Sequence, residues 1–312
     1  MDRRQFLHAG LAVAGSAALA AADTKKEKAV PIVDTHQHLW DLKQFKLPWV
    51  KEGSPLAKNY VLDDYRKATE GLNVVKTVYM EVDVDPSQQD AEADFVIGLC
   101  KDAQKTRMYG AVISGRPASD GFKKYVSRFK GSKHIKGLRQ VLHNEGNKAG
   151  YCLEPAFVKG IQLLGDLGLS FDICIRPGEL ADAAKLIDEC PGTRFILDHC
   201  GNANVQAKDR TAWQKGMGEV AKRKNVVCKV SGIVASAKPG AWSADDLAPI
   251  VNHTLDAFGP DRVMFGGDWP VCTLAATYRQ WVEALKAIVR GRKEEEQLKL
   301  FHDNAVKFYG LA

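Results

Sequence analysis

The sequence lacks the features that would mark a disulfide-stapled or membrane-embedded protein. It contains no CxxC pair, and no internal apolar run is long enough to cross a membrane. Its seven cysteines are an odd number, so they cannot all pair within one chain. Because free cysteine in an apolar strand behaves as a small hydrophobic residue, we expect buried thiols where cysteines lie in or beside such runs, at Cys174, Cys200, Cys228 and Cys272.

Long blocks of one charge are also absent. The net charge of +6 arises from 44 basic and 38 acidic side chains that are dispersed along the chain. Dispersed charge is typical of a solvated surface, so we expect no nucleic-acid partner. The 312 residues are 45% hydrophobic and 26% charged, which is ordinary for a globular protein and fits one large α/β domain or two small ones.

The N-terminal residues 1–22 have the pattern of a targeting segment. A twin-arginine motif, RRQFL at 3–7, precedes a run of small apolar residues that ends in a candidate cleavage site, AAA at 20–22. This pattern predicts export to the periplasm by the twin-arginine route, with no membrane partner after the segment is removed. An N-terminal anchor or a chance pair of arginines is the alternative. The lysine-rich residues 23–30 have no periodic apolar face and are interpreted as a linker.

Apolar, β-rich runs alternate with helix-like segments through the rest of the chain. The strands are predicted to begin at residue 32 and to recur at 74–82, 108–114, 135–142, 169–175, 194–198, 226–230 and 262–265. The predicted helices cover 62–71, 88–105, 121–129, 155–167, 179–189, 212–223, 245–258, 280–289 and 294–309. Eight such units predict an α/β fold, a (β/α)8 TIM barrel over residues 31–312. An open doubly wound sheet is the alternative, but it would normally carry a glycine-rich loop where this chain reads HQHLW.

The first predicted strand leads into the motif IVDTHQHLW at 32–40, which holds two histidines two residues apart. Side chains on a strand alternate between faces, so we expect His36 and His38 to project into one space, with Asp34 on the same side. Neutral imidazole is a common metal ligand, and two from one strand would make half of a tetrahedral site. A pair of hydrogen-bonded histidines near a strand end is the alternative interpretation.

Polar side chains also follow the apolar part of most other predicted strands. In a closed barrel the carboxyl ends of the strands meet on one face and hold the active site. Those ends carry, in chain order, Glu81, Asp83, Arg139, His143, Asp172, Arg176, Asp198, His199, Lys229, Ser231 and Asp268. Packing alone does not explain so many polar strand ends, so the sequence predicts an active site there.

Four motifs in this order resemble the amidohydrolase-related (amidohydrolase-2) family: DTHQHLW at 34–40, KGLRQ at 136–140, LDHCG at 197–201 and GGDWP at 266–270. Within it the chain is similar to the sugar-lactonase branch, the L-fuconolactonase-like proteins, whose relatives include pyrone-dicarboxylate lactonase. The resemblance covers residues 30–312 and implies a polar centre of His36, His38, His199 and Asp268. It implies Asp268 as general base for an attacking water, and histidines that hold a divalent metal or polarise the substrate carbonyl without one.

The sequence departs from the two-metal members of this superfamily. Those proteins place a bridging lysine on strand four and a histidine on strand five. This chain has Arg139 on the fourth predicted strand and no histidine in the fifth, which reads SFDICIRP at 170–177. We therefore expect one divalent metal, zinc by its ligand preference, or none. Its ligands would come from His36, His38, His199 and Asp268.

Five further residues are candidates for substrate contact. Arg139 offers planar bidentate contacts to a substrate oxygen or carboxylate, although a structural ion pair in the barrel rim would use the same group. Trp40 and Trp269 flank the predicted polar centre and could stack on a sugar-derived ring or simply pack at the barrel mouth. His143 and Arg176 are further candidates, with a surface-loop position as the alternative for His143.

Together these features predict a hydrolase that opens a small-molecule lactone, derived from a sugar acid, by attack of water. Lactone hydrolysis needs a nucleophilic water and an electrophile for the developing oxyanion, and Asp268 and His199 are the expected catalytic residues. A metal-dependent decarboxylase of an unsaturated or aromatic acid is one alternative, and a non-catalytic sugar-acid binding protein is another. Loops 41–60, 144–153 and 235–242 would select the lactone. The sequence is compatible with a homo-oligomer and with a monomer.

Overall fold

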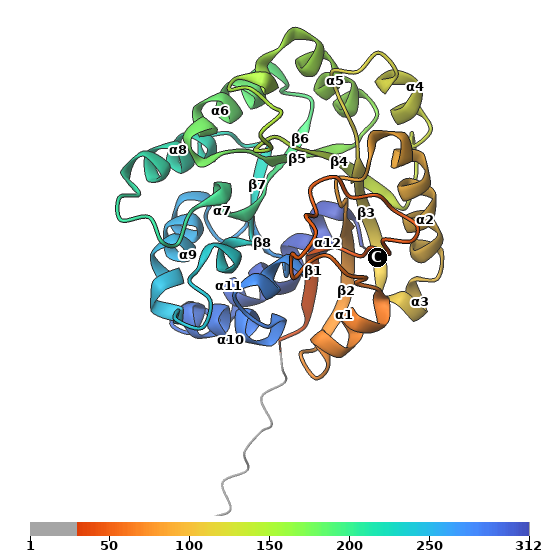
Figure 1. Cartoon of the computed structure of the whole chain (residues 1–312). Helices are drawn as coiled ribbons and strands as arrows, with labels where there is room; N and C mark the ends of the chain where they lie inside the picture. The colour runs from red at the N-terminus through yellow and green to blue at the C-terminus, as the bar shows by residue number, and fades with distance from the viewer. Residues whose placement is uncertain (1–29, 312) are drawn as a thin grey trace, which may run out of the picture.

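Eight parallel strands form the inner layer of the computed structural model and follow one another around a barrel in chain order (Figure 1). They are β1 (Ile32–Gln37), β2 (Val74–Met80), β3 (Met108–Ser114), β4 (Ile135–Val141), β5 (Ser170–Cys174), β6 (Arg194–Leu197), β7 (Val226–Val230) and β8 (Val263–Phe265). Backbone hydrogen bonds join the ends of the first and last strands: His38 N–H donates to the Trp269 carbonyl at 2.9 Å, and Asp268 N–H to the His36 carbonyl at 2.8 Å. The predicted (β/α)8 TIM barrel is confirmed.

The structure describes residues 30–311. The predicted signal segment, 1–22, and the predicted linker apart from residue 30 lie outside the described residues. Within the described range, no helix combines the length and the apolar character needed to cross a membrane. All seven cysteines fall inside it, and each is a free, buried thiol, which confirms the prediction made for Cys174, Cys200, Cys228 and Cys272.

Helices cover the outside of the strands (Figure 1). The α-helices are α1 (Leu62–Thr69), α2 (Gln89–Lys101), α3 (Ala103–Thr106), α4 (Phe122–Ser127), α5 (Pro155–Asp166), α6 (Leu180–Glu189), α7 (His199–Asn202), α8 (Thr211–Ala221), α9 (Ala244–Phe258), α10 (Tyr278–Val289), α11 (Glu294–Leu298) and α12 (Asn304–Tyr309). Short 3₁₀ turns are η1 (Pro86–Gln88), η2 (Tyr151–Leu153), η3 (Pro177–Glu179), η4 (Ile233–Ser236) and η5 (Val271–Leu274). Two predicted helices are interrupted. The one expected over 88–105 divides at Asp102, and the one over 294–309 contains a π-helical turn, η6 (Lys299–Asp303).

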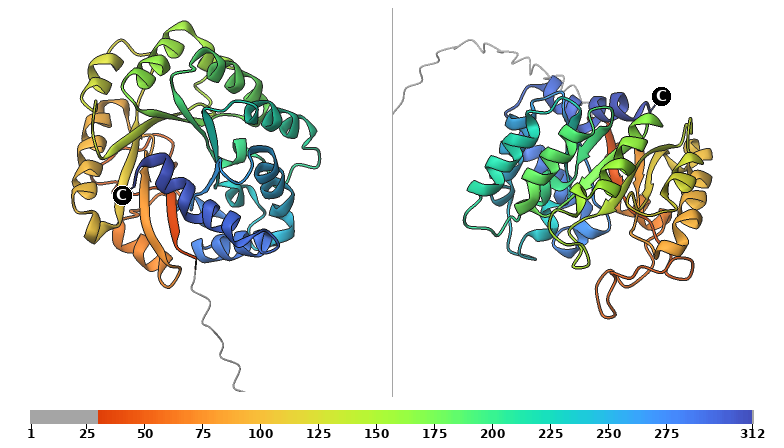
Figure 2. Two further views of the ribbon diagram at one scale, coloured as in Figure 1. Left: turned by 180° about the vertical axis from the view of Figure 1, so that it is seen from behind. Right: turned by 90° about the horizontal axis from the view of Figure 1, so that it is seen from above.

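The C-terminal helix α12 lies across the end of the barrel at which the strands begin (Figure 2). Ala305, Tyr309 and Leu311 pack against inward-facing apolar side chains of the strands, namely Val33, Val78, Met80, Val112 and Met264. Figure 2 also shows the C-terminus on the side opposite the long loop that follows β1. The carboxyl ends of the strands are therefore the open end of the barrel, which is where the polar strand-end residues lie.

Asp34 does not share the direction of His36, so the expectation from simple alternation is wrong. Its carboxylate accepts hydrogen bonds from Tyr65 of α1 at 2.7 Å, from Tyr278 of α10 at 3.0 Å and from the Gly267 N–H at 2.7 Å. The pairing register of β1 with β2 shifts between Asp34 and Gln37, which breaks the alternation of faces. Asp34 therefore braces the barrel against two helices instead of facing the site.

Another buried carboxylate, Glu92 of α2, reaches into the barrel wall. It accepts hydrogen bonds from the backbone N–H groups of Val82 and Ser114 and from the Tyr79 hydroxyl. Burial, reinforced by the negative charge of Glu81, raises the pKa of Glu92 from 4.5 to about 7. The folded chain therefore binds this proton more tightly than the unfolded chain does. The linked contribution to stability is present below pH 4.5 and is lost as the pH rises to about 7.

We expect Glu92→Gln to weaken the dependence of stability on pH. Between about pH 5 and pH 8, the loss of unfolding free energy should be smaller in the variant than in the wild type by roughly 3 kcal/mol. Thermal unfolding at the two pH values measures the difference. Glu294→Gln, at an exposed position of α11, is the matched control and should behave as the wild type does. An equal pH dependence in Glu92→Gln and wild type would contradict the assignment.

Candidate active site

Three imidazoles and one carboxylate, from the ends of β1, β6 and β8, converge at the open end of the barrel. The ring centroid of His36 lies 4.9 Å from that of His38 and 4.5 Å from that of His199. Asp268 Oδ1 lies 3.3 Å from His38 Nε2 and 3.7 Å from His36 Nε2. All four side chains are buried. The residues that the family motifs pointed to are therefore brought together: His38, His199 and Asp268 line one pocket floor, and His36 lies directly against them.

Asp268 and His199 both leave their strands in the left-handed backbone region, with φ of 52° and 55°. This conformation is uncommon for residues other than glycine and often marks functional sites, where the surrounding structure holds the strain. The His199 ring is fixed by Ser231, whose Oγ lies 2.9 Å from Nδ1. Gly232 makes room for the ring, because a Cβ there would lie 2.2 Å from Nδ1. The two turns aim the carboxylate and the imidazole at the same space.

His38 presents an unshared electron pair to Asp268. Its Nδ1 lies 3.0 Å from the Met80 carbonyl, which can only accept, so Nδ1 carries the proton. In the neutral ring, Nε2 therefore faces Asp268 Oδ1 as a second acceptor at 3.3 Å. Two acceptors at this distance repel each other unless a cation or a shared proton lies between them. Imidazole nitrogen and carboxylate oxygen are both zinc ligands, so the pair is suited to a divalent cation.

Arg139 of β4 lies at the pocket floor beside His36 and binds two buried carboxylates. Its Nε donates to Glu81 Oε1 at 2.6 Å, and its Nη1 donates to Asp198 Oδ2 at 3.3 Å. The same Nη1 lies 3.1 Å from His36 Nε2. Because a guanidinium only donates, His36 Nε2 is the acceptor, and its Nδ1 carries the proton and faces Asp198 Oδ1 at 3.6 Å. Arg139 therefore sets the tautomer of His36.

Asp198 is a site residue to which the sequence analysis assigned no role. Besides Arg139 and His36, it contacts Lys229, whose Nζ lies 3.3 Å from Oδ1. Burial alone would raise the pKa of Asp198, but Lys229 and His36 outweigh it and hold the pKa well below its ordinary value. Lys229 also pairs with the buried Asp172 of β5. The position of Asp198 directly before His199 in LDHCG could have indicated a site residue. The direction of the Asp198 side chain, however, could not be predicted from the motif.

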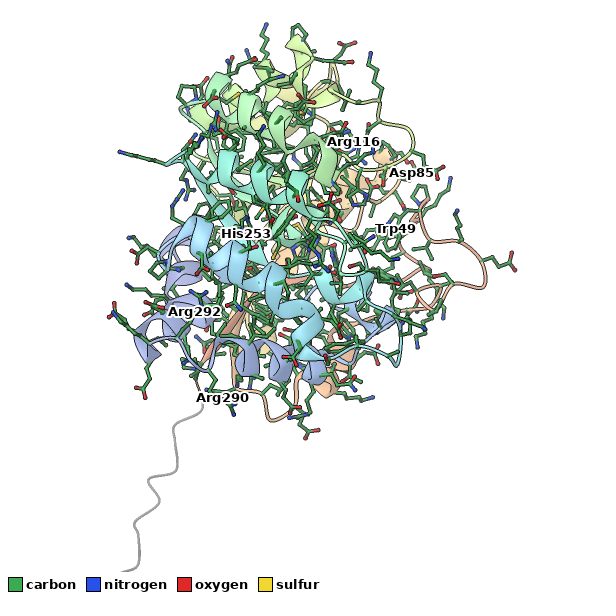
Figure 3. All side chains as sticks on the ribbon, turned by 90° about the vertical axis from the view of Figure 1, so that its left-hand side faces the viewer. Trp49, Asp85, Arg116, His253, Arg290 and Arg292 are labelled. Atoms are coloured by element: carbon green, nitrogen blue, oxygen red, sulfur yellow. The ribbon has the colours of Figure 1, made fainter. Side chains whose placement is uncertain are left out.

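A cavity of about 570 Å³ opens above the floor, which is a typical size for a small-molecule site. Its walls include Trp49 from the loop after β1, Asp83 from the end of β2, His143 and Asn144 from the end of β4, and Ile233 from η4. The Trp49 indole N–H donates to the Val82 carbonyl at 2.7 Å, which holds the long loop against β2. Figure 3 shows Trp49, Asp85 and Arg116 on one side of the molecule, the side on which the long loop projects.

Of the predicted substrate contacts, His143 and Arg139 line this cavity, whereas Trp40, Trp269 and Arg176 do not. Trp40 and Trp269 pack edge-to-face against Tyr60, with ring centroids 5.2 and 5.3 Å away, and are 1% and 3% exposed. Arg176 donates to two backbone carbonyls of the loop after β4. The two tryptophans therefore pack at the barrel mouth, and Arg176 holds a loop in place.

Two overlapping groups of side chains in residues 30–311 could hold a divalent cation. One is His36, His38 and Asp268, and the other is His36, Asp198 and His199, with ligand atoms within 4.8 Å of one another in each group. The first group fits zinc, because three protein ligands leave a fourth position open for water or substrate. Binding there would require Arg139 to release His36 Nε2. Both groups need His36, so they describe alternatives for one ion.

We expect the purified protein to bind no more than one divalent ion per chain tightly. A second ion would lie in a network that already contains two buried cations, Arg139 and Lys229. Elemental analysis of protein exported by its own signal measures the content. An ion held by His36, His38 and Asp268 should be lost in His38→Ala and retained in His302→Ala, at a histidine outside the cavity lining. Two ions per chain would contradict this interpretation of β4 and β5.

Known proteins share both the sequence pattern and the architecture. The L-fucono-1,5-lactonase of Burkholderia multivorans is 27% identical over 291 residues, which cover 89% of this chain and 96% of that protein. The L-rhamnono-gamma-lactonase of Scheffersomyces stipitis is 24% identical, with 90% and 98% covered. A zinc-bound crystal structure of an amidohydrolase from Burkholderia multivorans is 26% identical with a TM-score of 0.80, and 90% and 100% of the chains are covered. The Amidohydro_2 (amidohydrolase) family model matches residues 33–311, and the chain therefore belongs to this family of hydrolases.

Proposed function

We propose that the protein hydrolyses a small, uncharged lactone of a sugar acid. The observation that carries the proposal is the convergence of the Asp268 carboxylate with the imidazoles of His36, His38 and His199 at the floor of the cavity, where all but His36 line it. The relatives named as L-fucono-1,5-lactonase and L-rhamnono-gamma-lactonase support a lactone as the substrate.

Asp268 would act as the general base. A water molecule beside it gives a proton to the carboxylate while the water oxygen attacks the lactone carbonyl carbon. The bond from that carbon to the ring oxygen then breaks, and the proton passes from Asp268 to the ring oxygen. The product is the open hydroxy acid, which releases its own carboxyl proton at neutral pH.

His199 would stabilise the oxyanion that develops on the carbonyl oxygen. Burial alone would lower the pKa of His199, but the negative charge of Asp268 outweighs it and raises the pKa above its ordinary value. The protonated ring can donate from Nε2, while Ser231 fixes the ring through Nδ1. A fixed donor in a buried site stabilises a transition-state charge more strongly than water does.

A divalent cation on His36, His38 and Asp268 would supply Lewis-acid polarisation of the carbonyl and a more acidic water. The zinc-bound relative supports this assignment. The chain's own contribution is to fix His36 of β1 and His38, which directly follows β1. The Met80 carbonyl holds the proton of His38 on Nδ1, and Arg139 with Asp198 holds that of His36 on Nδ1.

The charges around the cavity favour an uncharged substrate. Among the described lining residues, Arg139 is the only lysine or arginine, and four of its five N–H groups are engaged by buried neighbours. Asp83 and Asp268 add negative charge to the lining. A substrate carboxylate would therefore find no lysine or arginine free of buried partners among the described lining residues. This argues against the aromatic or unsaturated acid that a decarboxylase would take.

A lactone panel assayed with a pH indicator tests the proposal. Acid release from L-fucono-1,5-lactone or another sugar lactone is the expected result. Release of carbon dioxide from an aromatic acid would favour the decarboxylase, and binding of sugar acids without turnover would favour a non-catalytic binding protein. Either of these outcomes, without lactone turnover, would overturn the proposal.

We also propose export to the periplasm by the twin-arginine route, on the support of the RRQFL motif and the apolar run within residues 1–22. Replacing both Arg3 and Arg4 by lysine should move the protein from the periplasmic to the cytoplasmic fraction, because the route reads the arginine pair itself. Replacing Lys25 and Lys26 by arginine is the matched control. Unchanged periplasmic recovery of the double variant would contradict this route.

A further inference from the structure

Asp83 is a charged residue of the cavity wall that the proposed reaction does not use. It follows β2, lines the cavity and keeps 17% of its side chain exposed. Its backbone has a φ of 48°, and its N–H donates to Glu81 Oε2 at 2.6 Å. A strained, anchored backbone at a cavity wall indicates a side chain whose direction matters.

Both oxygens of the Asp83 carboxylate are fixed by a single donor each. Arg116 Nη2 donates to Oδ1 at 2.7 Å, and Asn144 Nδ2 donates to Oδ2 at 2.8 Å. A carboxylate has about four acceptor positions, so about half of them stay available to a molecule in the cavity. Arg116 is not part of the cavity lining, so its charge orients the carboxylate from behind.

The neighbours of Asp83 define what can bind there. His143 lines the same wall; burial, followed by the positive charge of Arg139, lowers its pKa, so the ring is neutral. Asn144 contributes an amide. The wall thus combines one oriented carboxylate with two neutral polar groups. A hydroxyl group is the matching donor, because an O–H to carboxylate bond is short and strong and adds no charge to the cavity.

We propose that Asp83, with His143 and Asn144, binds ring or chain hydroxyl groups of the substrate. The enzyme would then select polyhydroxylated lactones over lactones that carry no hydroxyl group. This inference rests on the proposed lactone hydrolysis and identifies the residue that recognises the sugar part. Asp83 positions the hydroxyl-bearing portion while the carbonyl lies over the histidines and Asp268 at the floor.

The test compares two lactones in one variant. L-fucono-1,5-lactone carries ring hydroxyls, whereas δ-valerolactone has the same ring without them. Asparagine tolerates the left-handed backbone as aspartate does, so Asp83→Asn keeps the fold. We expect kcat/KM for the hydroxylated lactone to fall about 10- to 100-fold, mainly through KM, with little change for δ-valerolactone. Asp85→Asn, two residues along and outside the cavity lining, is the control and should leave the ratio unchanged.

Binding of L-fuconolactam, the nitrogen analogue that resists hydrolysis, separates this inference from the proposed function. If the wild type turns over no lactone but binds the lactam, and Asp83→Asn loses that binding, the subsite stands and the lactonase proposal falls. If Asp83→Asn lowers turnover of both lactones equally, Asp83 is only structural and the inference is overturned. It is also overturned if the variant loses neither turnover of the sugar lactone nor binding of the lactam.

Discussion

Asparagine in place of Asp268 is expected to reduce kcat for lactone hydrolysis by about 10³-fold while the barrel stays folded. The amide cannot take a proton from water, so the base is removed. The fold should persist for two reasons. Asparagine tolerates a φ of 52°, and its amide N–H can donate to His38 Nε2, where the carboxylate opposes another acceptor. Steady-state kinetics with a pH indicator and thermal unfolding measure the two effects.

Asp120→Asn, at an exposed position between β3 and α4, is the matched control and should retain wild-type kcat. Metal content of the Asp268→Asn protein should be determined alongside, because Asp268 belongs to a candidate ligand group. Activity within a few-fold of wild type in Asp268→Asn would show that this residue is not the base.

The barrel could be predicted from the sequence because two periodicities alternate along the chain. Strands buried on both faces are nearly continuous apolar runs, and the segments between them have a single apolar stripe. The pocket floor could be predicted for the same reason. His199 and Asp268 each lie shortly after the end of a strand, β6 and β8 respectively, and all strand ends meet at one end of a closed barrel. Strand order thus brings distant residues together without any knowledge of side-chain contacts.

Side-chain direction could not be predicted where the backbone departs from regular geometry. Alternation assigned Asp34 to the site, but a register shift in β1 turns it toward Tyr65 and Tyr278. Nearness in sequence made Trp40 a candidate for substrate contact, with packing at the barrel mouth as the alternative. Trp40 packs there against Tyr60, and Trp49 lines the cavity instead. Its position depends on the path of a long loop, which is fixed by tertiary contacts such as the bond from the Trp49 indole to Val82. Residues near a motif and residues near a ligand are therefore different sets.

Replacing Arg139 by methionine is expected to cost about 3–5 kcal/mol of stability and most of the activity. Glu81 and Asp198 would remain buried without their common partner, and an unpaired buried charge is far more costly than an intact pair is favourable. His36 Nε2 would also lose the donor that sets its tautomer. Thermal unfolding should show a decrease in Tm of roughly 10 °C for a domain of this size.

Arg128→Met isolates the contribution of burial, because Arg128 also pairs with two carboxylates, Asp90 and Asp94, but at the surface. Its side chain is 41% exposed, against 5% for Arg139, so solvent can hydrate the charges left behind. We expect Arg128→Met to cost less than about 1 kcal/mol and to leave kcat unchanged. Equal losses of stability and of kcat in the two variants would show that the buried network does not hold the floor of the site. A larger loss of both stability and kcat in Arg139→Met than in Arg128→Met means that the buried guanidinium stabilises the barrel and also orients His36 for catalysis.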